Sequence, residues 1–411
     1  MAVLTSGGTG AMLVTLLLTP IVARLYGPAD FGEMAALLAL CQPLVALATL
    51  QLGKAFILPQ DPQAARHLAQ ASVGWLALFI VVLSLLLWAS APWLDPYFAV
   101  DFARWWWVVP VIVALLGLTN LANGWNTREQ HFATMASAQV SRSVASGGVR
   151  VGAGWTWGSS VGGLVVGYLM GALLQLWLVL RPLPRGLLRP PSSAQAMLEP
   201  IREYRDFPLV NMPTTFLRGL AQVFPQLALA ALHTSAALGL YAMAVRLIGA
   251  PGNVLAAAVR RVYGQRTATQ HQAGHSLRPV LAKTTLALLA IGVAPALGLA
   301  LGGERLLVWV MGEAWIGIGA YTQLLALLLL TQWVTAPAAE TLVVLRRQVH
   351  TLRVQSAVLG AQVLGVLLSA TQGTGPVLLV ALLVAIRVLA DVFIVALAWV
   401  EAGRSTASAT K

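Results

Sequence analysis

Long apolar runs separated by short polar connections dominate this sequence. A helix needs about 20 mostly apolar residues to cross a bilayer, and twelve segments approach or reach that length, the fifth being the weakest. They lie at 9–25, 31–53, 69–91, 103–123, 132–153, 159–180, 207–231, 237–259, 280–301, 317–342, 353–371 and 376–399. The pattern predicts an all-α polytopic membrane protein with about twelve transmembrane helices.

The composition supports the same fold class. Of 411 residues, 58% are apolar and 10% are charged, whereas a soluble domain carries about 25% charged residues. The composition therefore excludes that the whole chain is a water-soluble enzyme. The chain has no P-loop, H-E-x-x-H or G-x-S-x-G motif, so we expect no catalytic residue, no cofactor and no metal. The single cysteine, Cys41, lies in an apolar run and is expected to be buried.

The excess of positive charge defines an orientation. The formal net charge is +12. We number the eleven connections between the twelve predicted helices in chain order. Eighteen of the 26 Lys and Arg residues lie in the even-numbered connections and the C-terminal tail, against four in the odd-numbered connections. Because cytoplasmic loops are enriched in Lys and Arg, both termini are predicted to be cytoplasmic. The cations form no stripe with interleaved aromatics, so we expect no nucleic-acid partner.

Tryptophans are frequent at the ends of the predicted helices. They are Trp93, Trp105–Trp107, Trp125, Trp155, Trp157 and Trp315. This placement is typical of anchoring at the membrane interface. A platform for stacking sugars is the alternative interpretation.

The chain divides into two halves of equal size. The longest predicted cytoplasmic connection, about 181–206, is rich in proline and leaves six predicted helices on either side. We predict an N-terminal lobe over 1–206, including this connector, and a C-terminal lobe with a short cytoplasmic tail over 207–411. A faint repeat links Phe31–Ala35 with Leu238–Ala242, each followed by a proline within the run. Six helices per lobe favour parallel repeats and a site near the midplane.

Polar side chains form stripes on three predicted helices, each with an arginine near mid-membrane. The stripes contain Gln139 and Arg142 in the run 132–153; Asn211, Thr215, Arg218 and Gln222 in the run 207–231; and Arg246 and Asn253 in the run 237–259. Intramembrane ionisable residues are functional candidates because each costs about 2.5–3.5 kcal/mol on insertion scales. These arginines have no acidic residue at comparable depth on the same helices. They either face a hydrated, cationic cavity that takes an anionic guest, or they snorkel and bind neighbouring carbonyls.

Acidic residues inside the predicted helices are few. Arg387 and Asp391 are spaced i,i+4 and can form an ion pair on one helix. The alternative is a cation-coupling or gating site around Asp391, with Glu340 and Arg387 as further candidates.

Four segments resemble one family of membrane proteins. They are Leu18–Gly32, Trp125–Phe132, Arg142–Ser143 with Gly147–Gly148, and Gly239–Leu247 with Pro251. Together with the twelve predicted helices and the central division, they resemble the Wzx-type polysaccharide and O-antigen flippases of the multidrug/oligosaccharidyl-lipid/polysaccharide (MOP) superfamily. The chain departs from the family by starting close to the first predicted helix, which indicates a truncated or misassigned start.

The resemblance implies a MATE-like fold of two six-helix lobes around a cationic, alternating-access cavity. Its cargo would be an undecaprenyl-pyrophosphate-linked oligosaccharide, carried across a bacterial inner membrane for surface polysaccharide or lipopolysaccharide synthesis. Other polysaccharide-assembly membrane proteins would be partners. Two other functions stay open: a cation-coupled drug or small-solute antiporter of the same superfamily, and a membrane scaffold that transports nothing.

Overall fold

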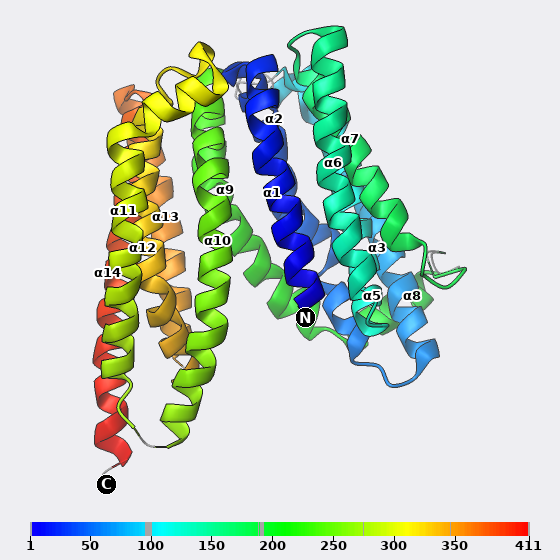
Figure 1. Ribbon diagram of the computed structural model, residues 1–411. Helices are drawn as coiled ribbons and strands as arrows, with labels where there is room; N and C mark the ends of the chain where they lie inside the picture. Colours follow the sequence, from blue (N-terminus) through cyan, green and yellow to red (C-terminus); the bar gives the residue numbers. More distant parts are fainter. Residues whose placement is uncertain are drawn as a thin grey trace. The chain divides into compact units, whose positions relative to one another are not determined.

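The protein is helical throughout the part of the chain that the computed structural model describes, which is residues 2–94, 101–187, 189, 193–273, 275–345 and 347–409 (Figure 1). No strand occurs in these residues. The chain forms two compact units, unit 1 (Met1–Gly239) and unit 2 (Leu240–Lys411). We describe each unit by itself. The predicted halves, 1–206 and 207–411, describe a duplicated six-helix lobe and not a compact unit, and they stay a prediction.

Unit 1 contains nine α-helices, a 3-10 turn and a π-helical turn within the described residues. They are α1 (Ala2–Leu25), α2 (Pro28–Thr49), η1 (Leu52–Ile57), α3 (Pro62–Leu94), α4 (Phe102–Trp105), α5 (Val108–Arg128), α6 (Phe132–Trp157), α7 (Val161–Leu180), α8 (Ala194–Glu203), the π-helical turn η3 (Phe207–Asn211) and α9 (Met212–Leu232). Helix α10 (Ser235–Gln272) begins at the end of this unit. Helix α2 packs against α5 and α9, and α6 lies between α1 and α7.

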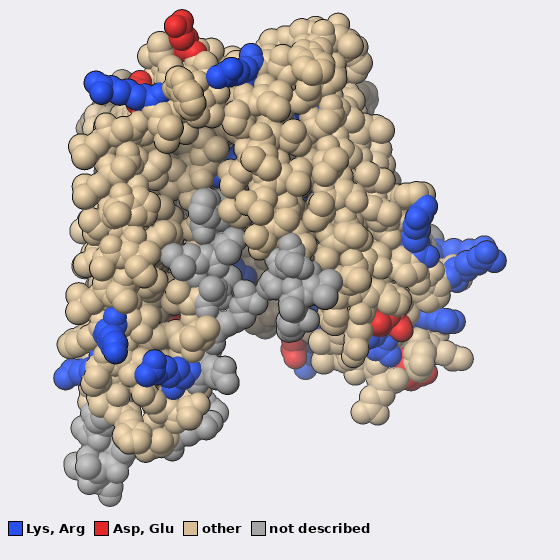
Figure 2. Space-filling view, viewed as in Figure 1, with Lys and Arg blue, Asp and Glu red and all other residues tan. Residues whose placement is uncertain are grey.

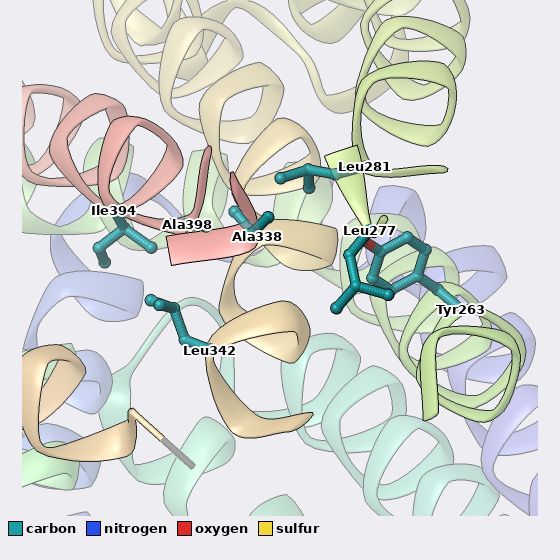
Figure 3. Packing of buried hydrophobic residues seen from close by; sticks show 8 residues of the cluster. Tyr263, Leu277, Leu281, Ala338, Leu342, Ile394 and Ala398 are labelled. Atoms are coloured by element: carbon teal, nitrogen blue, oxygen red, sulfur yellow. The ribbon is translucent and has the colours of Figure 1, made fainter. Parts of the chain in front are cut away.

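Unit 2 is built on α11 (Arg278–Met311), α12 (Ile318–Val344), α13 (Gln348–Gln372) and α14 (Pro376–Ala409), with the short turn η4 (Glu313–Trp315). Helix α12 packs against both α11 and α14. Near one end of this bundle, Tyr263 of α10 and seven small or aliphatic residues from α11, α12, α14 and the residue before α11 form a buried cluster (Figure 3). The Tyr263 hydroxyl shares a hydrogen bond of 2.7 Å with Thr341 Oγ1, which satisfies its polar end inside the apolar cluster.

Ten helices among the described residues are long and apolar enough to span a membrane. The two predicted runs outside these ten are 132–153, within α6, and 237–259, within α10, whose described side chains include the apolar stretch Ser235–Gly249. Both are continuous helices here. In the run 132–153, polar residues interrupt the apolar pattern. The two runs carry the mid-helix candidates Arg142 and Arg246.

Large apolar side chains cover the outside of the units. Such contiguous exposure is unusual in a soluble protein but is what lipid contact requires. Examples are Leu78, Val81, Leu85 and Leu86 on α3, Leu297 and Leu301 on α11, Leu364 and Leu368 on α13, and Leu389 and Val392 on α14. Cys41 is fully buried, as predicted. In Figure 2 the visible Lys and Arg side chains gather toward helix ends, and the long sides of the helices carry few charges.

A row of glycines lets α7 approach the polar helix α6. Gly163, Gly167 and Gly171 are spaced by four residues and so lie along one side of α7. A Cβ on Gly167 would lie 3.0 Å from the Ser146 carbonyl oxygen, and one on Gly171 would lie 2.8 Å from the Arg142 carbonyl oxygen. Small residues at this spacing are a common basis of helix packing in membranes.

Candidate functional site

The stripe predicted on α6 contains one anchored arginine. Arg142 is partly buried near the middle of α6. Its Nη1 donates a hydrogen bond of 2.9 Å to Gln175 Oε1 on α7, and its guanidinium lies 4.9 Å from the centre of the Tyr168 ring. Gln139, one turn earlier, is exposed. Arg142 is therefore held by its own unit while part of its side chain stays accessible.

The stripe predicted on α9 faces outward from unit 1. Asn211, Arg218 and Gln222 are exposed, and Thr215 is partly buried. Asn211 belongs to the π-helical turn η3, so the regular α-helical spacing of the stripe begins after it. Arg218 has no hydrogen bond or ion pair with the described residues, although it lies near the middle of a helix of membrane-spanning length.

The third stripe lies in unit 2. Arg246 is partly buried on α10. The Asn253 position is helical, but its side chain lies outside the described residues. The structure thus places Arg142 and Arg218 in one unit and Arg246 in the other.

Sequence reasoning missed one buried arginine and two polar partners. Arg150 lies inside α6, which continues to Trp157, with 9% of its surface exposed. The backbone carbonyl of Arg150 accepts a hydrogen bond of 2.8 Å from Tyr26. Gln175 and Tyr168, which hold Arg142, come from α7. The four-residue spacing of the α7 glycines is the sequence signal that could have indicated this packing.

Asp391 and Arg387 form the predicted i,i+4 ion pair. Arg387 Nε lies 3.5 Å from Asp391 Oδ1. Asp391 is 1% exposed, and its Oδ2 also accepts a hydrogen bond from Thr331 on α12. Arg387 Nη1 donates to Gln355 Oε1 on α13 at 3.0 Å. The pair therefore ties three helices of unit 2 together.

Glu340 lies apart from this pair along α12. It is partly buried, and its Oε2 would lie 3.6 Å from a Cβ placed on Gly264 of α10. It forms no salt bridge within the described part of unit 2. No group of three or more His, Cys, Asp or Glu that could hold a metal occurs among the described residues.

The segment Trp125–Phe132 clamps three elements of unit 1 together. Asn126 is fully buried; its Nδ2 donates 2.8 Å to the Val179 carbonyl oxygen on α7, and its Oδ1 lies 3.2 Å from His131 Nδ1. Arg128 Nη1 donates to the carbonyl oxygens of Phe56 and Pro59, each at 2.7 Å. The arginine thereby caps the end of η1.

The predicted interfacial role is wrong for two tryptophans. Trp125 is 3% exposed and Trp315 is fully buried. In contrast, Trp93, Trp155 and Trp157 each expose more than 60% of their surface. Trp125 is buried because it packs edge-on against Phe56, with ring centres 6.4 Å apart.

Comparison with protein families decides the classification. A family model described as "Polysaccharide biosynthesis protein" matches residues 21–320. The chain belongs to this family. A search of curated proteins finds no match. The flippase resemblance inferred from the four sequence segments is confirmed at the level of family and fold.

Three solved structures with a similar fold are remote from this chain in sequence. The lipid II flippase MurJ, in an inward closed conformation, superposes with a TM-score of 0.78 at 9% identity, covering 96% of this chain and 87% of that one. An inward-facing multidrug resistance MATE transporter gives 0.62 at 13% identity, covering 96% and 95%. A MOP superfamily transporter from Pyrococcus furiosus gives 0.53 at 16% identity, covering 100% and 96%. The polysaccharide biosynthesis family member is thus a multi-pass membrane protein with a MOP-type fold.

Proposed function

We propose that this protein is a flippase for undecaprenyl-pyrophosphate-linked oligosaccharides. It would move the repeat units of a surface polysaccharide, such as an O-antigen or exopolysaccharide, from the cytoplasmic to the periplasmic leaflet of a bacterial inner membrane. The family and the MOP-type fold support transport in polysaccharide synthesis. The observation that carries the proposal is Arg218, an exposed arginine near the middle of a membrane-length helix with no partner among the described residues.

An arginine at this depth helps a charged head group to cross the membrane. A pyrophosphate and a hydrophilic glycan cannot cross about 30 Å of hydrocarbon unaided. A guanidinium replaces the lost water with charge-assisted hydrogen bonds to the phosphate oxygens. Arg142 supplies a second guanidinium in the same unit, and its contacts with Gln175 and Tyr168 fix its position in advance. The polyprenyl tail would stay in lipid while only the head group passes.

The transport cycle follows from the fold class. Two six-helix lobes, 1–206 and 207–411, would rock against each other and expose the arginine-lined cavity alternately to each side. Gln139, Asn211, Thr215, Gln222, Arg246 and Asn253 would line the remainder. Both termini would be cytoplasmic, and other polysaccharide-assembly membrane proteins would take up the product. No chemical bond changes, so the protein acts as a transporter rather than an enzyme.

Export by a single-residue variant tests the proposal. Arg218→Ala should lower glycan export about 10- to 100-fold, because it removes hydrogen bonds to a charged group worth about 1.5–3 kcal/mol. The matched control is Arg202→Ala on α8, which removes an exposed arginine outside the membrane-length helices. Surface polysaccharide is measured in a deletion strain complemented with each variant at equal membrane abundance. Normal export by both Arg218→Ala and Arg142→Ala would refute the role of the arginines.

Lipid extraction from the deletion strain identifies the cargo. A flippase defect should leave one undecaprenyl-linked oligosaccharide on the cytoplasmic leaflet. The purified protein in vesicles should then move that lipid across the bilayer, which a scaffold would not do.

A cation-coupled antiporter is less well supported. Such a carrier needs a carboxylate that is free to exchange a cation. Asp391 instead binds Arg387 and Thr331 and is almost fully buried. The proton- or sodium-dependent efflux expected of an antiporter should therefore be absent from cells that express this protein.

A further inference from the structure

A small pocket in unit 1 contains hydrogen-bond donors that no part of the described chain uses. Its volume is about 240 Å³. It lies where the starts of α3 and α6 meet the ends of α5 and α7, outside the polar stripes of α6 and α9. Its walls include Arg66, Trp125, Arg128 and Glu129.

The first unused donor is the indole of Trp125. The residue is 3% exposed, and its Nε1–H is buried with no acceptor among the described residues. A buried donor without an acceptor destabilises the folded protein. Such a group in a pocket wall is explained if a ligand brings the acceptor.

The second group of donors is a pair of guanidiniums. Arg128 is held in place because its Nη1 caps the carbonyls of Phe56 and Pro59. Its other N–H groups have no partner among the described residues. Arg66, on the first turns of α3, is exposed and makes no hydrogen bond or ion pair there. Guanidinium and indole N–H groups only donate, so the ligand must supply acceptor oxygens.

The net charge of the wall selects an anion. Two guanidiniums face one carboxylate, Glu129, which is exposed. Asp61, a carboxylate outside this wall, accepts hydrogen bonds from the backbone amides of Gln63 and Ala64, which hold its pKa below the usual range. A phosphate has the oxygens and the charge to bind Arg66, Arg128 and Trp125 together. Glu129 could accept a hydrogen bond from a hydroxyl of an ester attached to that phosphate.

We propose that this pocket, the Trp125 pocket, is a binding site for a phosphate ester, separate from the transport cavity. The phosphate would come either from the head group of an anionic lipid or from a soluble phosphate compound. The site does not rest on the proposed transport function, because no residue of its wall belongs to the polar stripes.

Two variants test the site without removing its framework. Arg66→Ala deletes an exposed side chain that makes no hydrogen bond or ion pair with the described residues. Trp125→Phe keeps an aromatic ring against Phe56 and removes the N–H together with part of the indole ring. Arg266→Ala, which removes an exposed arginine of α10 in unit 2, is the control for overall charge.

Binding is measured on the intact purified protein in two arms. In the lipid arm, native mass spectrometry after exchange into phosphatidylcholine nanodiscs with or without phosphatidylglycerol reports the retained anionic lipid. In the soluble arm, thermal stability is followed against glycerol phosphate and inorganic phosphate. We expect Arg66→Ala to weaken binding at least tenfold and Trp125→Phe about three- to tenfold in one arm, with Arg266→Ala unchanged.

The arm that responds identifies the source of the phosphate. Loss of phosphatidylglycerol retention assigns a lipid head group, and loss of the thermal shift assigns a soluble ester. The site would be overturned if Arg66→Ala and Trp125→Phe bound as well as wild type in both arms. It would also be overturned if the wild type bound in neither arm. Neither readout requires transport, so failure here leaves the flippase proposal intact.

Discussion

Gly32 of α2 and Gly239 of α10 pack backbone against backbone within unit 1. Each is the fifth residue of its helix. A Cβ on Gly32 would overlap the Ser235 carbonyl oxygen, and a Cβ on Gly239 would overlap that of Pro28. Each glycine thus faces the other glycine and the carbonyl that lies four residues before that other glycine. The two glycines, one from each of the segments whose similar openings predict an internal repeat, are therefore in direct, reciprocal contact.

Substitution of either glycine should separate these helices. Gly32→Ala places a methyl group where a backbone atom already lies, and such overpacking costs about 1–3 kcal/mol. We expect a lower midpoint of thermal unfolding in detergent. Gly148→Ala on α6 is the matched control, because its Cβ would meet nothing within 4 Å. Equal thermal midpoints for Gly32→Ala and wild type would contradict the close approach.

The Gln175 side chain should position Arg142 for transport. Gln175→Leu keeps the volume but removes the acceptor of the 2.9 Å hydrogen bond. If the bond pre-organises the guanidinium, export should fall about three- to tenfold, in line with a net loss of about 1 kcal/mol. Surface polysaccharide is measured at matched membrane abundance. An Arg142→Ala, Gln175→Leu double variant should be no worse than Arg142→Ala alone, and additive losses would exclude positioning.

The Arg387–Asp391 pair should act on stability. Arg387→Ala leaves the buried Asp391 carboxylate without its cation, which costs about 3–5 kcal/mol when a buried pair is broken. Asp391→Asn in the same chain should recover most of that loss. Thermal unfolding in detergent measures both variants. Full stability of Arg387→Ala would show that the pair is not structural, and an efflux activity lost in Asp391→Asn would favour the antiporter.

The buried Asn126 should matter for the junction of α5, α6 and α7. Asn126→Leu leaves the Val179 carbonyl without its donor inside the unit, at a cost of about 1–3 kcal/mol. Thr127→Val is the neighbouring control, because Thr127 is exposed and bonds only within its own helix and to Met135. Limited proteolysis measures the effect, and Asn126→Leu should be cleaved faster than Thr127→Val. Equal resistance of the two variants would argue against the clamp.

Sequence reasoning succeeded where one physical effect dominates. Long apolar runs are dictated by the thickness of the hydrocarbon core, so ten of the twelve predicted helices meet the criteria for spanning. The run within α6 falls short because polar residues interrupt it, and the run within α10 is described with its side chains only as far as Gly249. The i,i+4 pairing of Arg387 with Asp391 was also readable, because both ends lie on one helix.

Contacts between helices were not readable, because they depend on rotations and depths that the local pattern does not contain. The sequence by itself determined the fold class, the helices and the positions of the mid-helix arginines Arg142, Arg218 and Arg246. Only the tertiary structure decided that Arg142 binds Gln175 and Tyr168 from α7 while Arg218 stays unpartnered among the described residues. It likewise buried Trp125, since a tryptophan near a helix end anchors in lipid or packs inward according to whether a neighbour such as Phe56 covers it.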